Sequence, residues 1–274
     1  GEHFATDSIL AKYRLNTVCE EAKCPNRMEC YSKKTATFLA LGKACTRNCG
    51  FCDIDFTKTP KEPESDEPER IAGSVRELGL KHVVITMVAR DDLPDGGAAH
   101  IAKIIDEVRK LNPGVTIEVL TSDFQGSYGA IDKVLEKRPD IFNHNIETVR
   151  ELSPRVRHKA NYERTLDILR YVKEQNKTSF VKSGIMVGLG ETKEQVQQTL
   201  MDLVQAGCDI ITIGHYLQAN VKKLTVKSFV SPEQFKEYEE FGYKIGAKHM
   251  YCGPFVRSSY NAGEILKTSK EFHV

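Results

Sequence analysis

The sequence has no apolar run that approaches the roughly 18 residues of a membrane-spanning helix. The sequence also has almost no net charge, because its 39 lysines and arginines nearly balance its 38 aspartates and glutamates and leave a net charge of +1. This balance provides no global attraction to nucleic acid or to an anionic membrane surface. We therefore expect neither a nucleic acid nor a membrane as a partner.

The sequence also lacks a recognisable secretory signal peptide and any internal repeat beyond a strand–helix period. We expect a cytoplasmic protein, or an organellar one if a targeting segment has been removed ahead of Gly1. The 274 residues suffice for one large α/β domain or two small ones. Arg155, Arg157, His158 and Lys159 form a local basic cluster, which either meets an acidic partner or faces solvent.

Cysteine is scarce over most of the chain and concentrated near its start. Six of the eight cysteines lie within residues 19–52, in the stretches "CEEAKCPNRMEC" and "CTRNCGFC". The long cysteine-poor remainder differs from the small disulfide-rich domains of secreted proteins. Metal or cluster ligation in a reducing compartment is the better interpretation of these two triplets.

Apolar runs alternate with helix-like stretches from residue 36 onward. The expected strands are 36–42, 81–88, 115–123, 140–147, 180–190 and 209–217, and the expected helices are 68–80, 97–113, 128–139, 161–176, 192–207 and 231–247. This alternation predicts parallel strands with right-handed crossovers. We expect an α/β fold, a partial (β/α)6 barrel over residues 36–247, with a flat doubly wound sheet as the alternative. A cysteine-rich N-terminal segment (1–35) and a C-terminal extension (248–274) flank it.

The spacing of the cysteines argues against zinc. A structural zinc site takes four ligands, usually as two close pairs, and neither triplet is built that way. An iron–sulfur cube has four irons, so three cysteines leave one iron open to a substrate or cofactor. A binuclear zinc cluster and a two-cluster electron carrier of the ferredoxin type remain as alternatives, but the carrier needs no such α/β body.

The second triplet, Cys45-x3-Cys49-x2-Cys52 after the first expected strand, resembles the signature of the radical S-adenosylmethionine (SAM) enzymes. Phe51, directly before the third cysteine, matches as well. In that superfamily the open iron chelates the amino and carboxylate groups of SAM. "GIMVGLGE" (184–191), with Met186 and Gly188, resembles the segment that lies near adenine in many members.

The first triplet narrows the resemblance to the lipoyl synthases. The motifs that match are "VCEEAKCPNRMEC", "ATFLALGKACTRNCGFCDI", "VARDDLPDGGA", "NHNIETV", "KSGIMVGLGE" and "GPFVRSSY", in this order. The resemblance implies two 4Fe–4S clusters, one held by Cys45, Cys49 and Cys52. The other is an auxiliary cluster held by Cys19, Cys24, Cys30 and Ser259. The two remaining cysteines, Cys208 and Cys252, are expected to be small buried apolar residues.

The family resemblance also implies a reaction. The cluster and SAM generate a 5′-deoxyadenosyl radical that takes hydrogen from C6 and then C8 of an octanoyl group, and the auxiliary cluster donates two sulfur atoms. The octanoyl group is carried on a lipoyl carrier protein, either a lipoyl domain or the glycine-cleavage H protein. An electron donor such as ferredoxin or flavodoxin is the second partner, and the enzyme is expected to be a monomer. A biotin-synthase-like enzyme or a methylthiotransferase is the alternative, but it does not explain the first triplet together with "RSSY".

Other residues are candidates by their position in the matching motifs. Polar groups at strand ends, Arg90, Asp91, Asn143, Asn145 and Glu147, are expected to contact the cofactor or to cap the strands. Arg257 is expected to orient the substrate or to pair with a carboxylate. The sequence departs from the family pattern at His215 and Ala219, where glutamine and proline are usual. It departs again at His158 and Lys159, where a proline–glycine pair is frequent.

Overall fold

A computed structural model describes residues 2–21, 26 and 35–259 of the chain. Two compact units make it up: unit 1 comprises Gly1–Thr46, Ile54–Asp140 and Ser259–Val274, and unit 2 comprises Arg47–Asp53 and Ile141–Ser258. No helix in the part of the chain that the structure describes is long and apolar enough to cross a membrane.

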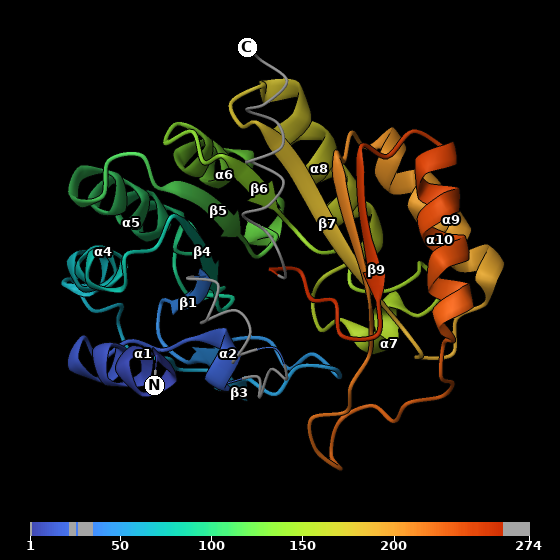
Figure 1. Cartoon of the computed structure of the whole chain (residues 1–274), viewed down its shortest axis with the longest axis horizontal. Helices are drawn as coiled ribbons and strands as arrows, with labels where there is room; N and C mark the ends of the chain where they lie inside the picture. Colours follow the sequence, from blue (N-terminus) through green and yellow to red (C-terminus); the bar gives the residue numbers. More distant parts are fainter. Residues whose placement is uncertain (1, 22–25, 27–34, 260–274) are drawn as a thin grey trace. The chain divides into compact units, whose positions relative to one another are not determined.

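Unit 1 contains three parallel strands in the order β1 (Thr35–Ala40), β4 (His82–Met87) and β5 (Thr116–Leu120). Helices α4 (Glu67–Leu78), α5 (Ala98–Leu111) and α6 (Tyr128–Leu135) follow one another beside these strands (Figure 1). Every residue of β4 is buried, as expected for a strand of a covered parallel sheet. The predicted strand–helix alternation is confirmed here.

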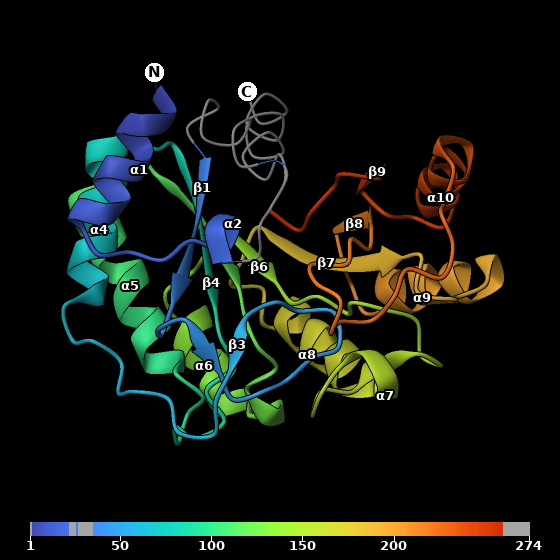
Figure 2. The ribbon, with the colours of Figure 1, turned by 90° about the horizontal axis from the view of Figure 1, so that it is seen from below.

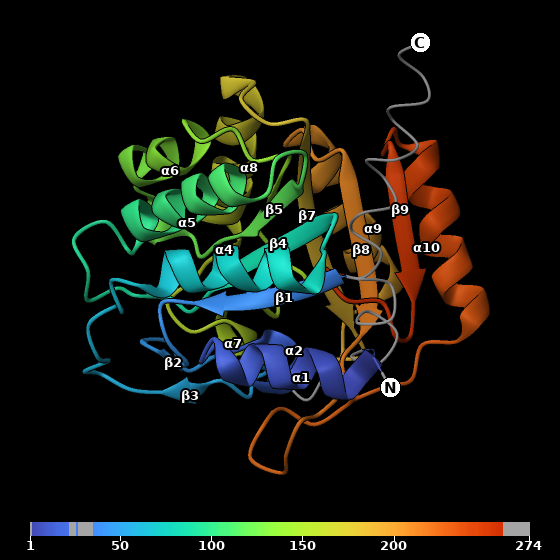
Figure 3. The ribbon, with the colours of Figure 1, turned by 60° about the vertical axis from the view of Figure 1, so that its left-hand side comes forward.

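Smaller elements complete unit 1. The N-terminal segment, in which the sequence indicated no helix or strand, contains α1 (Glu2–Lys12) and the short α2 (Val18–Glu21). Helix α1 packs along α4 (Figure 2), and the missing side chain of Gly73 leaves room there for the ring of Tyr13. The two-residue strands β2 (Ala44–Cys45) and β3 (Asp55–Phe56) pair in parallel (Figure 3), and a 3-10 turn, η1, spans Phe124–Gly126.

Unit 2 contains four parallel strands in the order β6 (Ile141–Asn143), β7 (Phe180–Val187), β8 (Ile210–His215) and β9 (His249–Gly253). Its helices are α7 (Ser153–Val156), α8 (Tyr162–Gln175), α9 (Lys193–Gln205) and α10 (Pro232–Lys244). The parallel sheet strands therefore number seven among the described residues rather than six. The additional strand, β9, lies in the stretch that we expected to be an extension.

Helix ends follow the expected chemistry. Gly79 ends α4 in the left-handed conformation, at a φ of 61°. The Ser231 side chain accepts a hydrogen bond from the Gln234 N–H at the start of α10, as its sequence predicts. Thr192 and Gln195 form a reciprocal capping box at the start of α9. These local signals explain why the predicted helix boundaries agree with the structure to within a few residues.

Asp209 joins three strands of unit 2 at their amino ends. Its carboxylate accepts hydrogen bonds from the Val181 N–H at 3.0 Å and from the Lys173 Nζ at 2.8 Å, and Lys248 Nζ lies 2.7 Å away. Its backbone carbonyl accepts from the His249 N–H at 3.0 Å. Burial by itself raises the pKa of Asp209, but the hydrogen bonds outweigh it and hold this pKa below its ordinary value.

We expect Asp209→Asn to lower the free energy of unfolding by about 2 kcal/mol at pH 7, because two lysines and an amide lose their anion. A lowered carboxyl pKa stabilises the fold above the pKa of the unfolded state, and this contribution disappears as the pH falls through the folded pKa. The difference between parent and variant should therefore shrink below about pH 4. Urea unfolding across this pH range measures it. Asp167→Asn, in an exposed pair with Arg170, is the control and should cost less than about 0.5 kcal/mol. An equal loss in both variants would contradict the role of Asp209.

Candidate functional site

The three cysteines of the second triplet are divided between the two units. Cys45 ends β2 in unit 1, whereas Cys49 and Cys52 lie in unit 2, where the Cys52 N–H donates to the Cys49 carbonyl at 3.3 Å. All three are half-buried thiols outside any disulfide among the described residues. Thiols are the ligands that iron–sulfur clusters take, so this donor set fits such a cluster. Within the described residues, no three Cys, His, Asp or Glu side chains stand at metal-binding distances.

The backbone around Cys45 is held at the end of β4. The Cys45 carbonyl accepts from the Thr57 N–H at 2.9 Å, and Thr46 donates to the Ala89 carbonyl from its N–H at 3.0 Å and from Oγ1 at 2.9 Å. Thr46 Oγ1 in turn accepts from the Asp91 N–H at 3.0 Å. These hydrogen bonds hold the backbone of Cys45 and Thr46, at the start of the cysteine motif, in a fixed position.

The turn that leads into Cys45 is held by a second set of contacts. Leu41 has a φ of 69°, its N–H donates to Glu67 Oε2 at 3.0 Å, and its carbonyl accepts from Arg90 Nη1 at 3.3 Å. Glu67 also meets His100 Nε2 at 2.7 Å. The Arg90 guanidinium also donates to both carboxylate oxygens of Asp92, at 2.9 and 2.7 Å, and these hydrogen bonds lower the pKa of Asp92. Arg90 therefore positions this turn, and its predicted contact with the cofactor stays a prediction.

Phe51 and Met186, two predicted cofactor residues, are brought together in unit 2. Both pack against one apolar cluster, which is built on the buried side chains of Val156, Leu189 and Tyr216. These residues come from the cysteine loop, the end of β7, the β8 end and α7. The aromatic of the cysteine motif and the methionine of "GIMVGLGE" therefore pack against the same apolar cluster.

The end of β6 presents the polar residues predicted there. Asn143 is fully buried, and Glu147 adopts a φ of 68° while its N–H donates to the Gly184 carbonyl at 2.9 Å. Desolvation raises the pKa of Glu147, against the opposing effects of Arg157 and Asn145. Arg157, a buried residue, also donates from Nη2 to the Asn145 carbonyl at 3.2 Å. A carboxyl and an amide thus lie together at the carboxyl end of this strand.

The segment Val256–Ser258 lies directly on β7 and β8. A Cβ built on Gly214 would stand 2.1 Å from the Val256 carbonyl oxygen and 3.2 Å from Arg257 Nη1. A Cβ on Gly184 would stand 3.2 Å from the Ser258 Oγ, and this hydroxyl accepts from Asn145 Nδ2 at 2.6 Å. Two glycines on neighbouring strands therefore make room for the segment that precedes Ser259.

The side-chain oxygen of Asn145 lies beside this segment and can still accept a hydrogen bond. Asn145 Oδ1 is buried and has no hydrogen-bond partner among the described residues. It stands 2.9 Å from the position that a Cβ on Gly184 would take, so a side chain at residue 184 would crowd it. A buried acceptor without a partner is a group that an N–H or O–H of a ligand could satisfy.

The carboxyl end of β7 is shaped by Glu191. Gly188 has a φ of 99°, and its N–H donates to Glu191 Oε1 at 2.5 Å, while the Leu189 N–H donates to Oε2 at 2.9 Å. A Cβ on Gly188 would stand 2.6 Å from the ring of His215. The departure from the family pattern at His215 therefore lies against the predicted adenine segment. His215 Nε2 also contacts the Ser228 carbonyl at 3.1 Å.

The remaining predicted residues receive less structural information. Cys24 and Cys30 lie outside the described residues, and only the backbone of Cys19, in α2, is described. Ser259 is half-buried. Cys208 is buried and Cys252 half-buried, and burial raises the pKa of both thiols far above the usual range. Sequence reasoning missed Ser258 and Gly214, although a glycine inside a strand is itself a signal of close backbone approach.

Comparison with known proteins shows the family of this chain. Residues 39–203 match the model of the radical SAM superfamily. A lipoyl synthase of Protochlamydia amoebophila (strain UWE25) is 61% identical over 97% of this chain and 83% of its own. One from Caldanaerobacter subterraneus subsp. tengcongensis is 53% identical over 93% of this chain and 89% of its own.

Solved structures show the same fold at low identity. The crystal structure of methylornithine synthase matches with a TM-score of 0.58 and 13% identity, over 90% of this chain and 81% of that one. TYW1 with a lysine–pyruvate adduct matches with a TM-score of 0.56 and 16% identity, over 87% and 88%. The α/β fold is therefore that of radical SAM enzymes, and the chain belongs to the lipoyl synthase family of this superfamily.

Proposed function

We propose that this protein inserts two sulfur atoms, at C6 and C8, into an octanoyl group carried on a lipoyl carrier protein. One observation carries the proposal: the segment Val256–Ser258 of the "GPFVRSSY" motif lies across Gly184 of β7 and Gly214 of β8, beside Asn145. The motif that distinguishes lipoyl synthases from other radical SAM enzymes is thus anchored to the strands that bear the predicted cofactor residues.

Two 4Fe–4S clusters are proposed. Cys45, Cys49 and Cys52 would hold one, and Cys19, Cys24, Cys30 and Ser259 would hold the other, from which the sulfur is taken. With SAM bound, the first cluster supplies a radical strong enough to remove hydrogen from an alkyl chain, which no side chain can do. The domain organisation that accompanies this assignment is residues 1–35 for the auxiliary cysteines, 36–247 for the barrel and 248–274 for the extension with "RSSY".

The chain's own residues would bind and orient SAM. Phe51 and Met186 offer an apolar surface that fits the adenine ring, with the backbone of Gly188 beside it. Asn145 Oδ1 can accept a hydrogen bond from the amino or hydroxyl groups of the cofactor. Asn143 and Glu147 belong to the same strand end, and Arg90 and Asp91 follow β4 in unit 1. Arg257 would orient the octanoyl substrate.

The partners follow from the same proposal. They are an octanoylated lipoyl carrier, either a lipoyl domain or the glycine-cleavage H protein, and an electron donor such as ferredoxin or flavodoxin. We propose a monomeric enzyme that works in the cytoplasm, or in an organelle if a targeting segment precedes it in the cell.

The direct test is an anaerobic assay of the protein loaded with iron and sulfide. It is incubated with dithionite, SAM and an octanoylated lipoyl domain, and 5′-deoxyadenosine and the lipoylated product are measured by mass spectrometry. The proposal requires both products and a change in the cluster spectrum when SAM is added. Formation of 5′-deoxyadenosine without any sulfur insertion would show a different radical enzyme.

Replacing Ser259 by cysteine tests the role of the serine. An oxygen ligand is harder than the thiolate that iron in these clusters prefers, so it should leave more easily when the cluster gives up sulfide. We expect Ser259→Cys to load iron and to cleave SAM like the parent, yet to stall at or before the first carbon–sulfur bond. Iron content, 5′-deoxyadenosine and product are measured together.

Ser258→Cys is the matched control, because it adds the same thiol one residue away, where the parent hydroxyl meets Asn145. Ser259→Ala should lose iron more readily than the parent, since no side chain replaces the ligand. If Ser259→Cys completes both sulfur insertions at the rate of the parent, the serine is not selected for its lability.

A further inference from the structure

Two basic segments of unit 2 flank the turn between Cys49 and Cys52. One is α7 with the residues that follow it, and the other is the long loop between β8 and α10. The six basic side chains that these segments present are called the basic collar: Arg155, His158, Lys159, Lys222, Lys223 and Lys227. The sequence cluster at 155–159 is thus half of a larger feature that only the fold assembles.

Both segments are bonded to Gly50, inside the cysteine motif. The Gly50 N–H donates to the Val156 carbonyl and the Leu224 N–H donates to the Gly50 carbonyl, each at 3.0 Å. A Cβ on Gly50 would stand 2.9 Å from the Leu224 side chain and 3.5 Å from the Arg155 carbonyl. The two segments that carry the collar are therefore in direct backbone contact with the turn that separates Cys49 from Cys52.

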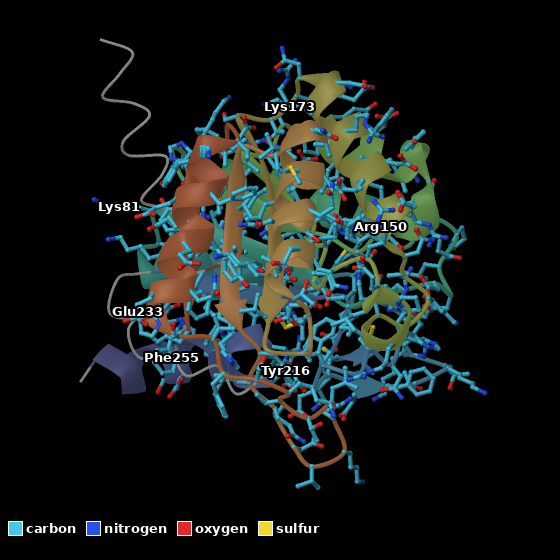
Figure 4. All side chains as sticks on the ribbon, turned by 90° about the vertical axis from the view of Figure 1, so that its right-hand side faces the viewer. Lys81, Arg150, Lys173, Tyr216, Glu233 and Phe255 are labelled. Carbon is cyan, nitrogen blue, oxygen red and sulfur yellow. The ribbon has the colours of Figure 1, made fainter. Side chains whose placement is uncertain are left out.

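The apolar side chains of the same two segments face inward. Val156, Leu224 and Val226 belong to the apolar cluster that holds Phe51. The Tyr216 hydroxyl donates to the Leu224 carbonyl at 2.7 Å, and Asn220 donates to the carboxylate of Asp53. These contacts fix the loop that Figure 4 shows extending beyond Tyr216, so the collar is a built surface rather than a loose chain end.

The charged side chains of the collar face solvent. Five of the six basic residues are exposed and Lys223 is half-buried, and no ion pair among the described residues involves any of them. Neither segment contains an aspartate or glutamate, from Leu152 to Tyr162 or from Ile210 to Pro232. Val221 and Phe229, 93% and 87% exposed, add apolar area to the loop. A chain with a net charge of only +1 thus concentrates positive charge here.

We propose that the basic collar is the docking surface for an acidic one-electron carrier protein that reduces the cluster held by Cys45, Cys49 and Cys52. This inference rests on the proposed function, because only a redox cluster needs such a donor. The donor gives up one electron and the cluster gains it, so no atom is transferred. Positive charge that surrounds the cysteine turn would steer an acidic donor to the point where its electron is needed. Small, charged and transient interfaces are usual for electron transfer.

The test measures binding as well as turnover. The dissociation constant for flavodoxin, an acidic carrier with a fluorescent cofactor, is determined with the loaded protein at about 50 and about 300 mM salt. We expect salt to weaken binding to the parent. We expect the triple variant Lys222→Glu, Lys223→Glu, Lys227→Glu to raise the dissociation constant at least about tenfold at low salt. The matched control Lys81→Glu, Lys110→Glu, Lys244→Glu changes the charge equally and should bind like the parent. All three of its lysines are exposed.

Activity then separates this inference from the proposed function. Dithionite needs no docking surface, so with dithionite the parent and the triple glutamate variant should form 5′-deoxyadenosine at equal rates. With reduced flavodoxin as the donor, the triple variant should form 5′-deoxyadenosine much more slowly than the parent. If the parent itself forms none with dithionite, the proposed function fails. The triple glutamine variant at 222, 223 and 227 decides the matter if the glutamate variant loses iron, and it should weaken flavodoxin binding several-fold.

Three results would overturn the docking proposal. The first is unchanged flavodoxin affinity in both collar variants, and the second is equal weakening in the control at 81, 110 and 244. The third is a collar variant that binds flavodoxin like the parent but has lost affinity for the octanoylated lipoyl domain. In that case the surface belongs to the substrate carrier.

Discussion

Replacing Cys45, Cys49 and Cys52 together by alanine will abolish the formation of 5′-deoxyadenosine. In the proposed function these three thiolates would hold the cluster whose fourth iron is open, and without them there would be no iron to bind SAM. The fold should survive, because alanine keeps the backbone hydrogen bonds of residue 45 with Thr57 and of residue 52 with residue 49. All three side chains are half-buried, so their loss creates no large cavity. Iron content, circular dichroism and 5′-deoxyadenosine are measured on the same preparation.

The contrasting variant carries alanine at Cys19, Cys24 and Cys30. It should still cleave SAM, because the first cluster is intact, but it should make no lipoyl product, because the sulfur donor is gone. Together the two variants assign one role to each triplet. Retained 5′-deoxyadenosine in the variant at 45, 49 and 52 would remove the basis of the assignment, and normal sulfur insertion by the variant at 19, 24 and 30 would require another sulfur source.

Much of the fold could be predicted because the buried strands and the helix ends carry local signals. The run "HVVITM" is buried at every position of β4, and Ser231 with Pro232 marks the start of α10. The elements that escaped prediction lack such signals. The apolar residues of α1, such as Ile9 and Leu10, do not repeat at helical spacing, and β9 reads "HMYCG", with only Met250 fully buried.

The candidate site could be predicted where one strand end supplies the residues. The rule that functional groups gather at the carboxyl ends of parallel strands selected Asn145 and Glu147, and the structure puts both at the end of β6. It could not select Ser258, which reaches Asn145 across 113 positions of sequence. Nor could it show that Arg90 holds the Leu41 turn, because this contact depends on a left-handed residue that is not a glycine.

The basic collar illustrates the same limit for a surface. The charges at Arg155, His158 and Lys159 are visible in the sequence, where they fit a solvated surface as well as a docking site. The partner segment around Lys222 lies more than sixty positions further along the chain. Only the hydrogen bonds of Gly50 to Val156 and Leu224 show that both segments flank one turn.

Besides the cysteine variants, we expect Gly214→Ala to reduce lipoyl product strongly. An alanine Cβ at this position would stand 2.1 Å from the Val256 carbonyl oxygen, a backbone atom that no rotamer change can move away. The segment that precedes Ser259 must therefore shift off β8, at a cost of about 1–3 kcal/mol. A displacement of about 1 Å at a reacting group can cost roughly a hundredfold in rate. Lipoyl product should thus fall about a hundredfold.

Cleavage of SAM separates displacement of the segment from general damage. Because the Gly214 contact involves Val256 and Arg257 and none of Cys45, Cys49 and Cys52, 5′-deoxyadenosine should fall much less than lipoyl product. The control Gly129→Ala lies in α6 with no atom within 4 Å of the new Cβ, and it should be neutral or stabilising by up to about 1 kcal/mol.

The yield of lipoyl product from Gly184→Ala should lie between the yields from Gly129→Ala and Gly214→Ala. The Cβ added at residue 184 would meet only side-chain atoms, Thr212 Oγ1 at 2.6 Å, Asn145 Oδ1 at 2.9 Å and Ser258 Oγ at 3.2 Å, which can turn aside. Because this variant crowds Asn145, it should weaken SAM binding as well as sulfur insertion, whereas Gly214→Ala should leave SAM affinity close to that of the parent. Product yields ranked Gly129→Ala, Gly184→Ala, Gly214→Ala from high to low are the expected series. If Gly214→Ala keeps full lipoyl product, the segment Val256–Ser258 does not have to rest on β8 for the reaction.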